Sequence, residues 1–150
     1  MSTHLPRASA RSRPPNLAIL LREPFRIGSA ALAERFAERG HSQVRPPHGN
    51  VFQFLDDDGT RVSLLAERAQ IAKQSMAELV AHLERHGYVE RVPDPADRRA
   101  KLVRATSRGD ELYAIAGEFV AELEIEWGRR LGRRKMGQLR ELLAELNEVL

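Results

Sequence analysis

The sequence predicts a mainly α-helical fold with one small β-hairpin. Two helical patterns joined by a tight turn occupy residues 63–87, and two short stretches of β-type alternation follow at 88–92 and 100–106. Long apolar stripes with helical spacing lie on both sides of this centre. Because a chain of this length and hydrophobic content is most simply one domain with its own core, we expect a single domain over residues 14–150.

Composition limits the classes of protein that this chain can belong to. It has 150 residues, 42% of them hydrophobic, and no apolar run near the roughly 18 residues that a membrane span needs. Residues 1–13 carry Arg7, Arg11 and Arg13 among Ser, Ala and Pro, and we expect a disordered basic arm there. No signal-type apolar segment follows, which predicts a cytoplasmic protein. The absence of cysteine excludes disulfides, thiolate metal sites and thiol redox sensing.

An amphipathic helix is predicted at about 15–40. Its apolar stripe comprises Leu17, Leu20, Leu21, Phe25, Gly28, Leu32 and Phe36. We expect Pro24 to kink this helix and Gly40 to end it. A shorter helical stretch begins near Pro46 and ends in the acidic run 56–58 before a glycine. We interpret that run as a solvated loop rather than a metal or acid/base site.

A helix-turn-helix is the interpretation of residues 63–87. Ser63 is placed to cap a first helix through Ala69, with Leu64, Leu65 and Ala66 turned inward. The second helix carries a core stripe of Ile71, Met76, Leu79, Val80 and Leu83. Its other face presents Lys73, Gln74, Ser75, Ala77, Glu78 and His82, and small hydrogen-bonding residues at a helix N-terminus suit the DNA major groove. An ordinary solvated amphipathic helix is the alternative.

The hairpin that follows has the composition of a DNA-binding wing. Pro93 and Pro95 stiffen the turn between the two strands, and Asp97 is placed to pair with a nearby guanidinium. The basic residues of this tip are Arg98, Arg99 and Lys101, which we expect to contact DNA, with the arginines in the minor groove. The alternative is that these residues only keep the edge of the hairpin soluble.

The stretch from Leu65 to Thr106, together with the "SRGDEL" that follows, resembles the helix-turn-helix and wing of the MarR family of bacterial transcriptional regulators. The family's wing pattern is an aspartate two residues before an arginine, then a strand ending in a threonine that leads into a long helix. Asp97, Arg99 and Thr106 match it. The resemblance is strong over about 60–110. It implies a homodimer of winged helices, a palindromic operator and usually repression.

The resemblance also implies roles for individual residues. Arg99 corresponds to the minor-groove arginine, Asp97 to its orienting partner, and residues 73–75 to the start of the recognition helix. Ala72 departs from the family, which often has a small hydroxyl residue there, and Glu78 stands where an arginine is common. Because a glutamate repels phosphate but can accept a hydrogen bond from cytosine, the operator cannot be copied from relatives.

The C-terminal region, at about 107–150, predicts dimerisation. It carries two apolar helical stripes separated near Gly132, the first with Leu112, Ile115 and Phe119 and the second with Met136, Leu142 and Leu150 among its members. With the helix at 15–40 they offer more apolar surface than a winged helix at about 46–106 can cover. The residues expected at a dimer interface are Leu17, Leu20, Leu21, Leu123, Trp127, Leu139, Leu143 and Leu146. An intrachain helical bundle is the alternative.

The net charge is only +3, but basic residues gather at the tip of the hairpin and at 129–135. The second cluster comprises Arg129, Arg130, Arg133, Arg134 and Lys135. Interaction with a helix C-terminus and solvation explain it, and contact with DNA or an anionic effector is the alternative.

We find no enzyme motif: GxxxxGK[ST], GxGxxG, HExxH and GxSxG are all absent. Glu78, His82 and His86 share one helical stripe and could hold a metal, but we interpret them as exposed helix positions and expect no metal and no cofactor. The favoured function is therefore a homodimeric DNA-binding regulator, and the alternative is a winged helix that binds protein.

The resemblance also implies a small-molecule effector. In the family, a small ligand, often aromatic and anionic, binds between the winged helix and the dimerisation helices and releases DNA. The corresponding region here lies near residues 17–32, 48–55 and 112–123.

Overall fold

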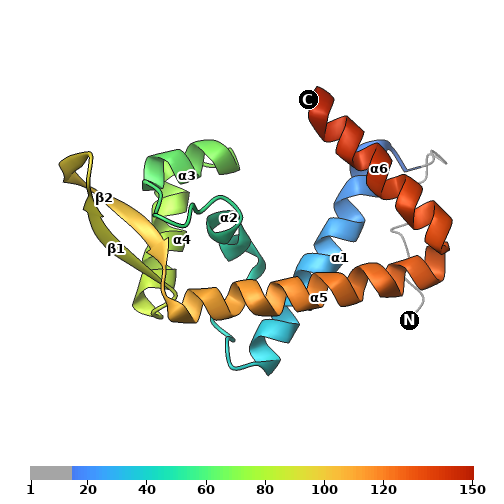
Figure 1. The fold of residues 1–150 in the computed structure, drawn as a ribbon, viewed down its shortest axis with the longest axis horizontal. Coiled ribbons are helices and arrows are strands. Elements are labelled where there is room, and N and C mark those ends of the chain that lie inside the picture. The colour runs from blue at the N-terminus through green and yellow to red at the C-terminus, as the bar shows by residue number, and fades with distance from the viewer. Residues whose placement is uncertain (1–14) are drawn as a thin grey trace, which may run out of the picture.

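The computed structural model describes residues 15–150, so the predicted basic arm at 1–13 lies outside the described residues. Its elements are α1 (Leu17–Glu38), the 3-10 helix η1 (Pro46–His48), α2 (Gly49–Phe52), α3 (Val62–Ala69), α4 (Lys73–Arg85), β1 (Val89–Asp94), β2 (Asp97–Ala105), α5 (Ser107–Leu131) and α6 (Arg133–Val149). This confirms the predicted mainly α fold with a small β wing. Helix α5 runs along most of the molecule, with α3, α4 and the hairpin near one end and α6 at the other (Figure 1).

Helix α1 begins where a side chain satisfies its first backbone groups. The Asn16 side chain accepts a hydrogen bond from the Ile19 amide at 3.0 Å. The helix continues through Pro24, which removes one internal hydrogen bond without ending it. Gly40 follows the C-cap with a φ of +90°, a left-handed conformation that glycine adopts without strain.

The start of α3 differs from the prediction. Arg61, not Ser63, is the N-cap, no side chain caps the helix, and Ser63 lies exposed in the first turn. The reason is a backbone bridge: the Thr60 amide donates to the Val103 carbonyl at 2.8 Å and the Thr60 carbonyl accepts from the Val103 amide at 2.9 Å. Because this bridge holds Thr60 extended, the helix begins directly after it. Leu65 and Ala66 are buried as predicted, but Leu64 is 38% exposed because it lies off the buried stripe.

The core of the winged helix lies between α3, α4 and the hairpin. Met76, Val80 and Leu83 of α4 are fully buried, and the other two residues of the predicted stripe, Ile71 and Leu79, pack against the same core as partly buried side chains. The other fully buried side chains there include Leu65, Tyr88 and Val103. This packing fixes one face of α4 and leaves its opposite face outward.

The hairpin is longer than predicted. The two strands pair antiparallel from Val89 opposite Ala105 to Pro93 opposite Lys101, and after a shift in register Asp94 lies opposite Asp97. Pro93 and the arginines that we assigned to the tip therefore belong to strands, and the turn contains only residues 95 and 96. An edge strand tolerates a proline because it need not donate a hydrogen bond on its open side.

The long helices α5 and α6 extend from the winged helix. The Thr106 hydroxyl oxygen caps α5 by accepting from the Gly109 amide at 3.2 Å, and it donates to the Gly87 carbonyl at 2.6 Å. Gly132, with a φ of +98°, separates α5 from α6. Within residues 15–150, no helix is both long enough and apolar enough to cross a membrane.

Candidate nucleic-acid interface

Helix α4 presents an outward polar face. Lys73, Gln74, Ser75 and Glu78 are exposed, while Ala77 and His82 are half-buried. The face is held in place by the buried residues on the other side of α4. The structure thus leaves most of the α4 side chains that we predicted to contact DNA accessible to solvent.

The N-terminus of α4 has no side-chain cap. Ala72 is the N-cap residue, with an extended ψ of 139°, and its methyl group cannot accept a hydrogen bond. The first backbone N–H groups of the helix are therefore left for solvent or for a phosphate, and the helix dipole favours an anion at that end. Lys73, the first helical residue, adds a positive charge beside them.

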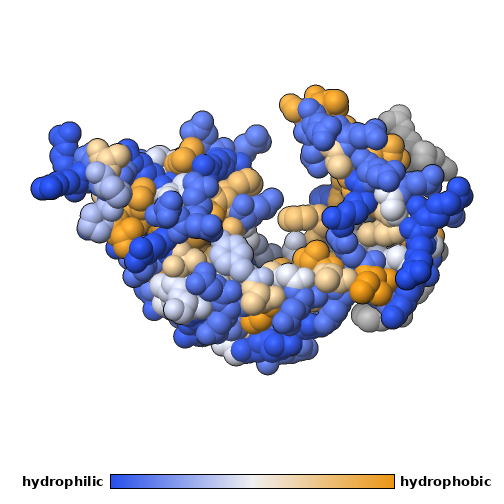
Figure 2. Space-filling view, in the orientation of Figure 1, coloured by the Kyte–Doolittle hydropathy of each residue, from blue (hydrophilic) through white to orange (hydrophobic). Residues whose placement is uncertain are grey.

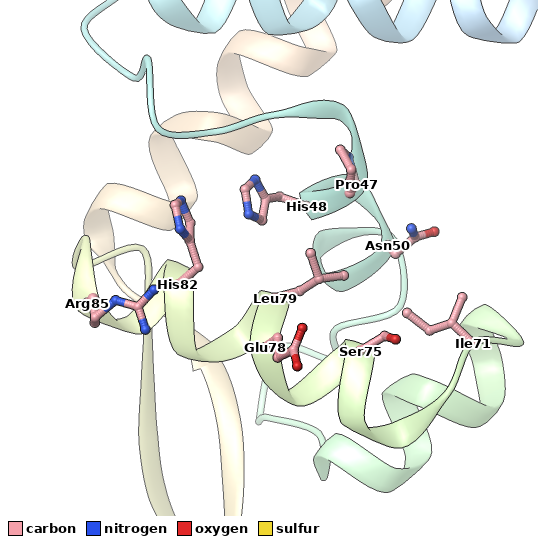
Figure 3. A pocket seen from close by; sticks show the side chains of 9 residues that line it. All are labelled: Pro47, His48, Asn50, Ile71, Ser75, Glu78, Leu79, His82 and Arg85. Carbon is pink, nitrogen blue, oxygen red and sulfur yellow. The ribbon is translucent and has the colours of Figure 1, made fainter.

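A hollow of about 510 Å³ lies at the surface between α4 and the segment that forms η1 and α2. It is lined by Pro47, His48, Asn50, Ile71, Ser75, Glu78, Leu79, His82 and Arg85. Figure 3 shows Ser75, Glu78, His82 and Arg85 along α4, with His48, Pro47 and Asn50 facing them. Residues from the 47–50 segment therefore lie next to the face of α4 that we predicted for DNA.

Three histidine rings form a row beside this hollow. The rings of His48 and His82 stack with centroids 4.5 Å apart, and His86 lies 4.6 Å from His82. The backbone amide of Arg45 donates to His48 Nδ1 at 2.8 Å, and His82 Nε2 lies 2.9 Å from the Gln43 carbonyl, to which it can donate. His82 is thus half-buried and tied to the 43–48 segment. Among residues 15–150, no group of histidine and carboxylate side chains is arranged to hold a metal.

The environment of His48 opposes its protonation. Burial, and then the positive charge that His82 would carry, lower the pKa of His48 from 6.5 to about 4. The pKa of His86 is lowered for the same two reasons, in the same order. Sequence reasoning missed the contribution of His48, since no local pattern links it to the second helix.

The wing presents its basic side chains to solvent. Arg98, Arg99 and Lys101 are exposed, and the Arg99 side chain is 96% exposed. Asp97 Oδ1 accepts a hydrogen bond from the Arg99 amide at 3.1 Å and lies 3.7 Å from the Arg99 Nε. This geometry suits the orienting role that we predicted for Asp97.

A second aspartate of the wing makes a stronger contact than Asp97 does. Asp94 is buried, and its Oδ2 accepts from Arg61 Nε at 2.7 Å and lies 2.6 Å from Arg61 Nη2. Its Oδ1 accepts from the Ala96 amide at 2.9 Å. The hydrogen bond from the Ala96 amide, and then that from Arg61, hold the pKa of Asp94 below its ordinary value. Sequence reasoning did not single out either residue of this pair.

The residues predicted for a dimer interface are among the less covered apolar side chains. Leu17, Leu20, Leu21 and Leu139 are between 41% and 63% exposed, while Leu123, Trp127, Leu143 and Leu146 are half-buried. Helix α6 buries none of its residues within the described chain. Hydrophobic side chains reach the surface on the α6 side of the molecule (Figure 2).

The fold and this surface define a winged helix-turn-helix protein of the DNA-binding class. Residues 42–100 match the model of the MarR family. The chain is 35% identical to the HTH-type transcriptional regulator FarR of Neisseria gonorrhoeae over 100 residues. The matched region covers 66% of this chain and 68% of FarR. The chain therefore belongs to the MarR family and is a transcriptional regulator.

Other relatives agree. The transcriptional regulator HosA of Escherichia coli O111:H- is 30% identical over 103 residues, or 69% of this chain and 73% of HosA. The structure of the regulator Tm0710 of Thermotoga maritima is 27% identical, with a TM-score of 0.61 over 87% of this chain and 90% of its own. MarR of E. coli shares the fold, with a TM-score of 0.77 at 19% identity over 89% of this chain and 98% of MarR.

Proposed function

We propose that this chain is a homodimeric repressor that reads a palindromic operator with two winged helices. The observation that carries the proposal is the outward polar face of α4 beside a hairpin whose Arg99 side chain is 96% exposed. A recognition helix needs a free polar face to reach base edges, and a wing needs free basic side chains to reach the minor groove.

The contacts that we propose divide into two kinds. Base readout in the major groove comes from α4, through Lys73, Gln74, Ser75, Ala77, Glu78 and His82. The wing contributes Arg98, Arg99 and Lys101, which contact the minor groove and phosphates. The first kind sets sequence preference, and the second supplies affinity that weakens with salt because bound counterions are released.

The proposed dimer forms through α1, α5 and α6. Leu17, Leu20 and Leu21 of α1 are 41–63% exposed within the described chain, and α6 buries none of its residues there. A second copy offers the same surface in a two-fold arrangement. Such symmetry places the two recognition helices about one DNA turn, roughly 34 Å, apart on a palindromic site.

An effector site is the further part of this proposal. A related fold, CouR from Rhodococcus jostii RHA1, has been solved bound to p-coumaroyl-CoA. Here a hollow of about 370 Å³ lies where α5 meets the winged helix, lined by Leu55, Asp56, Asp57, Ala105, Asp110 and Tyr113. This hollow overlaps the region expected for an effector only near Leu55 and Tyr113. Asp56 is paired with Arg68 at 2.9 Å, but Asp57 and Asp110 also line the hollow and keep it acidic. We therefore expect an effector bound there to be neutral or cationic rather than the anion expected from the family.

The proposal places the protein in the cytoplasm, acting on DNA and not as an enzyme. Its test is a fluorescence-anisotropy titration of a duplex from the gene's own upstream region, against a scrambled duplex, at two salt concentrations. Tight binding to the upstream duplex alone that weakens steeply with salt supports the repressor. Equal and feeble binding to both, followed by a failed random-sequence selection, favours a winged helix that binds protein.

Two variants assign the contacts. Arg99→Ala is expected to weaken binding about tenfold on all duplexes, whereas Gln74→Ala changes the preference among them. Arg134→Ala removes the same charge at the start of α6, far from the wing (Figure 1), and is expected to change little. A large loss with Arg134→Ala instead assigns the basic cluster at 129–135 to DNA.

A further inference from the structure

We propose that Arg61 positions the wing. It forms an ion pair with Asp94 and lies close to Asp97, and these contacts hold the tip of the hairpin so that Arg99 can reach DNA. The inference rests on the proposed function and adds a residue outside the wing and outside α4. Arg61 is the N-cap residue of α3, so the contact joins the helix-turn-helix directly to the tip of the hairpin.

The first step is the grip on Asp94. The Asp94 side chain is only 9% exposed, and both of its oxygens are engaged, one by two nitrogens of Arg61 and the other by the Ala96 amide. The Ala96 contact closes the turn, and the Arg61 contact attaches that turn to α3. Asp94 also lies at the shift in register of the hairpin, where regular strand pairing has ended. Side-chain contacts therefore have to hold the tip there.

The second step links Arg61 to the DNA-facing arginine. Asp94 and Asp97 are partners across the hairpin, and Arg61 Nη2 lies 3.9 Å from Asp97 Oδ2 as well. Asp97 in turn accepts the Arg99 amide hydrogen bond. Two carboxylates directly opposite each other in a hairpin repel. The guanidinium of Arg61 offsets that repulsion and keeps the backbone at Arg99 in place.

The third step is that Arg61 attaches the tip of the wing, whereas other contacts between the wing and the helix-turn-helix lie nearer its base. Thr60 pairs with Val103 through two backbone hydrogen bonds near the base of β2, and Arg91 Nε of β1 donates to Glu84 Oε2 of α4 at 3.0 Å. Arg61, the neighbour of Thr60, holds Asp94 at the tip. This contact joins the tip to α3, and α3 packs directly on α4.

The test asks whether the removal of a negative charge from the wing strengthens or weakens binding to DNA. Asp94→Asn removes a negative charge from the wing, so electrostatics alone predicts tighter binding to DNA. Positioning by Arg61 predicts the opposite, a loss of about tenfold in affinity for the operator duplex. Asp58→Asn removes the same charge from an exposed loop position and is expected to leave binding equal or slightly tighter. The measurement is anisotropy titration of the full chain, well below its melting temperature.

A second comparison separates positioning from general damage to the fold. If Arg61 acts through Arg99, then Arg99→Ala costs much less affinity in an Arg61→Gln background than in the wild type. A merely structural role leaves the cost of Arg99→Ala unchanged. Arg61→Lys keeps the charge but cannot hold both aspartates, and it is expected to lose about fivefold in affinity. This variant serves if Asp94→Asn fails to fold.

The outcomes are distinct. Binding by Asp94→Asn that equals or exceeds that of the wild type, or an unchanged cost of Arg99→Ala in the Arg61→Gln background, overturns the positioning role and leaves the proposed function standing. Failure of the wild type to bind any duplex overturns the proposed function, and the positioning role with it.

Discussion

His48 and His82 stack face to face, with their ring planes only 14° apart. The contact fastens η1 to α4, and Arg45 and Gln43 complete it through their backbone groups. Because the Arg45 amide donates to Nδ1, His48 carries its single proton on Nε2 when it is neutral. Glu78 and Arg85 line the same hollow, and their opposite charges partly cancel. A proton added to His48 therefore places a charge in a buried site against a second imidazole.

Acid is expected to destabilise the fold through His48. The pKa of His48 is about 4 in the folded chain and near 6.5 when unfolded, so the ring is neutral in both states above pH 6.5. Below that pH the unfolded chain takes up the proton first, and stability is lost between pH 6.5 and about 4. The loss from pH 7 to pH 5 is at most roughly 2 kcal/mol, and less where water in the hollow screens the charge. Urea unfolding at the two pH values measures it.

The control for this effect is His48→Asn, whose side-chain oxygen can still accept the Arg45 amide hydrogen bond. Protonation of carboxylates whose pKa is lowered, such as Asp94, also destabilises the fold in acid, but these groups are present in both the wild type and the variant. The variant should therefore lose less stability than the wild type over the same pH interval. Equal losses would show that His48 is not the responsible group.

Gly109 is expected to tolerate no side chain. A Cβ there would overlap the backbone carbonyl oxygen of Tyr88, which cannot move without displacing the start of the hairpin. Gly109→Ala should lower the free energy of unfolding by about 1–3 kcal/mol. In Gly117→Ala the added Cβ meets nothing within 4 Å, and the variant should gain about 0.5–1 kcal/mol. Thermal unfolding of both variants tests the contrast, and similar melting temperatures would contradict it.

Local patterns predicted the fold well because helix and strand periodicities are local. The spacing of Met76, Val80 and Leu83 predicted the buried side of α4, and the structure buries all three. The same reasoning failed at Ser63, because the start of α3 depends on the bridge from Thr60 to a strand far along the chain. Propensity carries no information about such a partner.

The candidate site was predictable as a face but not as a set of contacts. Exposure of Lys73, Gln74 and Arg99 follows from the positions that the core stripe and the hairpin leave free. The contact of Arg61 with Asp94 joins residues 33 positions apart. No pattern in one sequence pairs a particular arginine with a particular aspartate when many of each are present.

Ala72→Ser is expected to stabilise α4. The hydroxyl would accept a hydrogen bond from a backbone N–H in the first turn, where no side chain now does so. The gain should be about 0.5–1 kcal/mol in urea unfolding. Ala121→Ser makes the same change at an exposed position inside α5 and should cost up to about 0.5 kcal/mol, since serine is a poorer helix former. A loss of stability with Ala72→Ser would contradict the account of an unfilled cap.

A charge on the uncovered face of α1 is expected to separate the dimer. Leu20 is 46% exposed within one chain, and Leu20→Glu would bury a carboxylate if that face is an interface. Sedimentation should find the wild type at twice the 16.9 kDa chain mass and the variant at the single mass. Leu64→Glu places the same charge at a similarly exposed leucine of α3, outside the predicted interface, and should leave the dimer intact. Operator affinity should fall with Leu20→Glu alone, because a single winged helix reaches only one half-site at a time. A wild-type chain that sediments at the single mass would contradict the dimer.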